Sequence, residues 1–199
     1  MSRRNPSGSK WFLLAGAALT LALLSSAPAV SASAGSDVAF RTSIDPGKVI
    51  LFVEEEWAST GDRTSMSLYG DGRLEVTHGV VGGAAPVSRS RQLTAGAAEE
   101  LVRLVVEYGL AEYDAPTIEA RLRSRVGDVI PISSDGPLVA VLVSLEELRR
   151  GGQVRAPLFT RIQLSSPRLL AKSFPDFSEF EGLVRLMDYM HEALSQGEG

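Results

Sequence analysis

Three consecutive carboxylates, Glu54, Glu55 and Glu56, are candidates for metal binding or acid–base chemistry. With Asp62 or Asp71 they could gather oxygen ligands for Ca²⁺, or supply an acid and a base for hydrolysis. They follow an apolar β-branched run, and successive side chains of a strand point to opposite faces. At most two of the three therefore converge, and no D-x-[DN]-x-[DN]-G loop accompanies them. We expect a solvated strand end.

The two histidines, His78 and His191, stand in a chain without cysteine. A zinc site would need carboxylates as its other ligands, and neither histidine has a second ligand at a recognised spacing. His78 follows Leu74 and Val76 at a spacing of two residues, so in a strand all three side chains point to the same face. This places His78 at the end of a buried strand face. His191 falls in the last turns of a helix, where a protonated imidazole suits the helix dipole. We expect structural roles for both, with no metal and no cofactor.

Three alternate arginines, Arg121, Arg123 and Arg125, could form an anion site. In an extended segment all three would share one face and could bind a carboxylate or phosphate, whereas a helix would spread them round its axis. We favour scattered surface charge, because such runs are commonly solvated.

Catalytic motifs are absent from the sequence. It contains no G-x-S-x-G, P-loop, G-x-G-x-x-G or H-E-x-x-H pattern, and its serines have no local base to activate them. The sequence therefore predicts no catalytic and no metal-binding residue, and leaves the binding residues unknown.

The N-terminal residues have the composition of an export signal. Arg3, Arg4 and Lys10 precede the apolar run Trp11–Leu24, and small residues follow in Ala27–Ala34. The apolar run has 14 residues, and about 20 are needed to span a bilayer. We therefore predict a cleaved signal peptide over residues 1–34.

The preferred cut follows Ala34, with cuts after Ala29 and Ala32 as alternatives. The remaining chain would carry 17 basic and 24 acidic residues, a net charge of −7, which argues against nucleic acid and anionic membrane as partners. We expect a secreted or periplasmic bacterial protein whose partner is an unknown protein or small ligand. An uncleaved signal would instead make it a membrane-anchored accessory protein.

The clearest local structure is a β-hairpin around Asp71. A two-residue turn would send the apolar side chains of its two strands to opposite faces. A three-residue turn, with Gly72 in the left-handed region, pairs Leu68 with Leu74 and Met66 with Val76. One face is then apolar and the other polar, which predicts an antiparallel sheet with helices on one side only.

We predict a tether over residues 35–47 and one α+β domain over residues 48–195, with an antiparallel sheet of about 4–6 strands and two main helices on one face. The main helices are expected from Thr94 to Gly109 and from Ser178 onward. We also expect a strand starting near Lys48, an edge strand at 89–93 and a weaker helix at 116–125. A strand is expected at 138–143, followed by a strand or helical turn at 144–150. A further strand at 158–164 follows the Gly151-Gly152 turn.

Three turn and cap motifs occur in order: Leu68–Arg73, then Leu93-Thr94 with Tyr108–Leu110, then Ser134–Pro137 before an apolar strand. In this order, over roughly residues 48–194, the chain resembles an uncharacterised family of secreted bacterial proteins of unknown function. The resemblance implies a shared α+β fold and no known activity. The expected function is a non-catalytic binding or interaction domain, and the alternative is a carboxylate-dependent envelope hydrolase.

Overall fold

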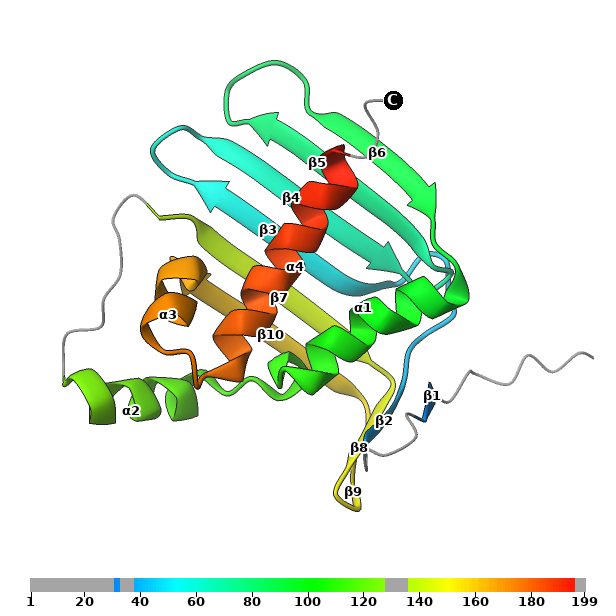
Figure 1. Cartoon of the computed structure of the whole chain (residues 1–199). Helices are drawn as coiled ribbons and strands as arrows, with labels where there is room; N and C mark the ends of the chain where they lie inside the picture. The colour runs from blue at the N-terminus through cyan, green and yellow to red at the C-terminus, as the bar shows by residue number, and fades with distance from the viewer. Residues whose placement is uncertain (1–30, 33–37, 128–135, 196–199) are drawn as a thin grey trace, which may run out of the picture.

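The computed structural model describes residues 31–32, 38–127 and 136–195. Within these ranges a six-stranded antiparallel sheet is covered on one face by helices (Figure 1), which confirms the predicted two-layer α+β fold. The strand order is β10-β7-β3-β4-β5-β6. The strands are β3 (Val49–Trp57), β4 (Asp62–Tyr69), β5 (Arg73–Val80), β6 (Val87–Gln92), β7 (Leu138–Leu145) and β10 (Leu158–Ser165).

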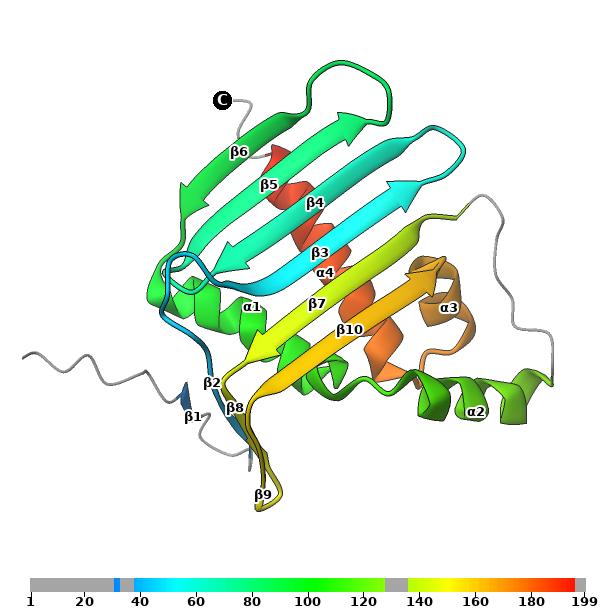
Figure 2. The same ribbon diagram turned by 180° about the vertical axis from the view of Figure 1, so that it is seen from behind.

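The β4–β5 hairpin has the predicted register. Leu68 lies opposite Leu74 and Met66 opposite Val76, and all four side chains are buried. Gly72 has φ 82°, the left-handed conformation that the three-residue turn requires. We call the helix-covered side the inner face and the other side the outer face. No helix in the described ranges covers the outer face (Figure 2).

The two main helices lie where the capping signals predict them. In α1 (Ala95–Glu107) the Thr94 hydroxyl accepts the Ala97 N–H at 3.2 Å, and the chain leaves the helix through Gly109 at φ 75°. A short 3₁₀ turn, η1 (Leu110–Glu112), follows. The last helix, α4 (Ser178–Ser195), lies against the inner face beside α1.

A second, smaller core forms at one end of the sheet between α2 (Ala115–Val126), α3 (Pro167–Ser173) and the start of α4. The helix α2 confirms the weaker helical prediction, and Asp114 caps it by accepting the Thr117 N–H at 3.2 Å. The sequence did not predict α3, because seven residues are too few to show a helical period.

The predicted tether is wrong at residues 38–41. Residues Val38–Arg41 form strand β2, and the Phe40 side chain is buried. This strand joins a small antiparallel sheet with β1 (Ser31–Ala32), β8 (Glu147–Arg150) and β9 (Gln153–Arg155). Within the 144–150 segment, β7 ends at Leu145 and β8 begins at Glu147, so the segment is strand in both parts with a bend at Glu146. The Gly151-Gly152 turn joins β8 to β9, while β10 pairs with β7.

Close packing of α4 on the end of α1 depends on Gly182, which is buried in α4. A Cβ at this position would lie 2.5 Å from the Cβ of Tyr108, closer than two carbons can approach. Only glycine therefore lets the two helices meet here.

We expect Gly182→Ala to lower the free energy of unfolding by about 1–3 kcal/mol, because the added methyl forces the helices apart. Gly96→Ala is the matched control, since a Cβ at this α1 position meets no atom within 4 Å, and alanine favours the helix. Urea unfolding of both variants measures the difference. Equal stability of the two variants would contradict the packing argument.

Candidate functional site

A hollow of about 350 Å³ opens where the start of α1, the β4–β5 turn and the segment after β2 meet. Its volume falls within the range of small-molecule sites, at the lower end. We call it the apolar cleft, because most side chains that line it are apolar: Phe40, Ile44, Ile50, Leu93, Ala95, Ala98 and Val102. Five lining side chains add polar groups: Thr42, Tyr69, Asp71, Gln92 and Glu99.

Two backbone features shape the apolar cleft. A bulge between Val49 and Leu51 interrupts the pairing of β3 with β4, and Ile50 and Leu51 are both buried although they are neighbours. At the turn, a Cβ on Gly70 would lie 2.5 Å from the carbonyl oxygen of Ser43. Glycine at position 70 therefore lets the segment after β2 lie against the turn and close one side of the cleft.

Two polar side chains that line the apolar cleft, Glu99 and Gln92, already have partners within the protein. The Glu99 carboxylate accepts a hydrogen bond from Arg103, four residues along α1. The side-chain amide of Gln92 donates to the carbonyl oxygen of Asp71 at 2.6 Å. Neither arrangement pairs a nucleophile with a base, so the cleft is suited to binding an apolar group rather than to acid–base chemistry.

The glutamate triplet is divided between the two faces of the sheet, as strand alternation predicts. Glu54 lies on the outer face and forms an ion pair of 2.6 Å with Arg63, and Glu56 lies on the same face opposite Arg63. Glu55 points inward and is 2% exposed. The triplet therefore does not form one carboxylate cluster, and the predicted solvated strand end is wrong for Glu55.

Glu55 is paired with His191 at the C-terminal part of α4. The Glu55 carboxylate lies 2.5 Å from Nε2 of His191, whose side chain is 44% exposed. This hydrogen bond raises the pKa of His191 above its usual value, against the opposing effect of burial. A sequence pattern could not reveal the pair, because 136 positions separate its members.

His78 lies on β5, two strands from Glu55, in the same row of the inner face. Its Nδ1 is hydrogen-bonded to the hydroxyl of Thr64 at 2.9 Å, and Thr64 lies opposite Glu55. Asp62 begins β4 opposite Trp57, while Asp71 caps the hairpin turn by accepting the Arg73 N–H. Among the described residues, no three acidic or histidine side chains come together as ligands of a metal ion.

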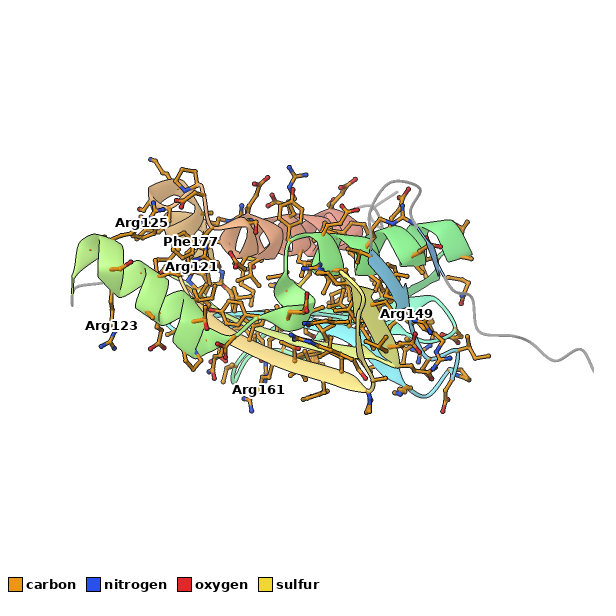
Figure 3. All side chains as sticks on the ribbon, turned by 90° about the horizontal axis from the view of Figure 1, so that it is seen from below. Arg121, Arg123, Arg125, Arg149, Arg161 and Phe177 are labelled. Carbon is orange, nitrogen blue, oxygen red and sulfur yellow. The ribbon has the colours of Figure 1, made fainter. Side chains whose placement is uncertain are left out.

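The three arginines lie on a helix, α2, and do not form an anion site. Arg121 pairs with Glu179 at 2.9 Å, Arg125 pairs with Asp176, and both guanidinium groups lie over the ring of Phe177. Figure 3 shows these two side chains beside Phe177 and Arg123 directed elsewhere. Two of the three arginines therefore hold α2 against the start of α4.

No protein-family model matches the chain, and no similar protein was found in a search of curated proteins. The resemblance to secreted bacterial proteins therefore stays a prediction. The predicted signal peptide lies outside the described residues except for Ser31 and Ala32. Within the described ranges, no helix has the length and apolar character needed to cross a bilayer.

The raised pKa of His191 predicts a pH-dependent contribution to stability. A group whose pKa is higher in the folded state stabilises the fold fully below its unfolded pKa of about 6.5, and loses this effect as pH rises through the folded value. We expect the stability difference between wild type and His191→Gln to be larger at about pH 6 than at about pH 9.

Chemical unfolding at the two pH values measures this difference. Glu55→Gln and the double variant complete a double-mutant cycle, which isolates the coupling of the pair. A difference that does not change with pH would contradict the charged hydrogen bond.

Proposed function

We propose that the chain is an exported, non-catalytic binding domain whose apolar cleft takes the apolar part of a small amphipathic ligand. The observation that carries the proposal is the cleft itself, a hollow of about 350 Å³ with apolar walls drawn from separate segments of the chain. Filling such a hollow removes apolar surface from water, which is favourable without any specific chemistry.

The placement of the polar groups supports a ligand that is mostly apolar. Glu99 and Gln92, which line the cleft, are engaged by Arg103 and by the Asp71 carbonyl, so a strongly polar ligand would have to displace these contacts. Ile44, at the edge of the cleft, is 55% exposed. An exposed apolar side chain beside a hollow is typical of a binding surface.

The alternative of a carboxylate-dependent hydrolase has less support. Glu54 and Glu55 lie on opposite faces of the sheet, so they cannot flank one substrate bond. Glu54 and Glu56 share the outer face with Arg63, and the guanidinium group of Arg63 is paired with Glu54 at 2.6 Å. The Glu54 carboxylate is therefore already bound by a side chain of the protein itself.

We expect the neutral fluorophore Nile red to bind the wild-type protein saturably, and Ala95→Leu to weaken this binding by about tenfold because the larger side chain occupies the cleft. Ala97→Leu is the matched control, because Ala97 lies on the same helix but does not line the cleft. Fluorescence titration gives both affinities. Absence of saturable binding, or equal weakening in both variants, would contradict the proposed site.

The proposed export predicts a shortened chain. After expression in a bacterial host, we expect the protein from the periplasm or medium to begin at Gly35, because the preferred cut follows Ala34. The small sheet would then keep β2, β8 and β9 and lose β1. N-terminal sequencing and intact mass identify the first residue. Recovery of the uncut chain from the cytoplasm alone would contradict export.

A further inference from the structure

A second hollow, of about 320 Å³, lies on the outer face and shares no residue with the apolar cleft. We call it the outer-face pocket. Its polar floor comes from three neighbouring strands and consists of Glu54 on β3, Arg63 and Ser65 on β4, and Thr77 on β5. Its location separates it from the cleft of the proposed function, so the two sites can be tested independently.

The floor offers hydrogen-bond donors and acceptors side by side. Glu54, Ser65 and Thr77 are cross-strand neighbours in one row, at the close spacing of directly opposed side chains. Arg63 uses part of its five-donor group to bind Glu54 at 2.6 Å. The hydroxyl of Ser65 has no hydrogen-bond partner among the residues that the structure describes.

The rim of the pocket is apolar, and a backbone hydrogen bond holds it in place. Val80, Val81, Ala84 and Pro86 line it, and Val81 is 66% exposed. The backbone N–H of Val81 donates to the carbonyl oxygen of Gly61 at 2.8 Å, which ties the β5–β6 connection to the neighbouring β3–β4 turn. The hollow is thereby formed before any ligand arrives, which reduces the entropy lost on binding.

We propose that the outer-face pocket binds a neutral saccharide ring. Among the residues that line the pocket, the opposite charges of Glu54 and Arg63 offset each other, so the lining itself carries no net charge. Each sugar hydroxyl both donates and accepts, and adjacent hydroxyls can meet the carboxylate and the guanidinium group together. The C–H side of the ring can then lie against the valine and proline side chains of the rim.

Saturation-transfer NMR with the methyl glycosides of glucose, galactose, mannose and N-acetylglucosamine tests the proposal. We expect at least one of them to bind with a Kd on the order of 1 mM, a typical value for a small ligand making few hydrogen bonds. The corresponding oligosaccharides distinguish a free sugar from a polysaccharide chain, because a chain would bind more tightly through flanking rings.

Ser65→Ala should weaken binding by about 3- to 10-fold, because it removes one hydrogen-bonding hydroxyl. Ser67→Ala is the matched control: Ser67 lies on the same strand and face, two residues away, and does not line the pocket. Glu54→Gln should weaken binding further. Ala95→Leu, in the apolar cleft, should leave sugar binding unchanged, so failure of one site does not imply failure of the other.

Three results would overturn the proposal. The first is absence of saturable binding for the whole sugar panel by protein whose circular dichroism shows a folded state. The second is equal weakening by Ser65→Ala and Ser67→Ala. The third is tighter binding of acetate or methylammonium than of any sugar, which would mean that the pocket selects a charged group.

Discussion

The register of the β4–β5 hairpin is the constraint on which the rest of the molecule depends. A shift by one residue would send Met66 and Leu68 to the face opposite Leu74 and Val76. The three-residue turn prevents this shift, because Gly72 adopts the positive φ that the turn needs. The apolar side chains of the hairpin can then all meet the helices on one side. The other side keeps its polar side chains and with them the outer-face pocket.

Strand alternation also places one ionisable group inside this packed layer. Glu55 belongs to the inward row of β3, where a carboxylate without a partner would be costly to bury. His191 on α4 is the partner of Glu55. When its imidazole is protonated, the positive charge strengthens the attraction between the helix and the carboxylate on the sheet. The attachment of the last turns of α4 is therefore partly electrostatic, while at the other end of the helix Gly182 allows the close approach to Tyr108.

Local sequence signals predicted most of the main sheet and both main helices, because turns and caps depend on residues within a few positions of each other. The small sheet was missed for the opposite reason: β2 becomes a strand only because β8, more than a hundred residues later, lies beside it. The apolar cleft was missed as well. Its walls come from separate segments, and residues such as Ile50 and Val102 are of the same types as core residues.

By itself the sequence determined local structure and the side to which each side chain points. Examples are the hairpin register, the ends of α1, and the placement of Glu54 and Glu55 on opposite faces of a strand. Only the tertiary structure decided partners, such as His191 for Glu55 and Phe177 for Arg121. The physical reason is that backbone geometry sets where a side chain points from its near neighbours alone. The residues that a side chain contacts depend on which distant element packs against it. The hollows between elements depend on the same packing.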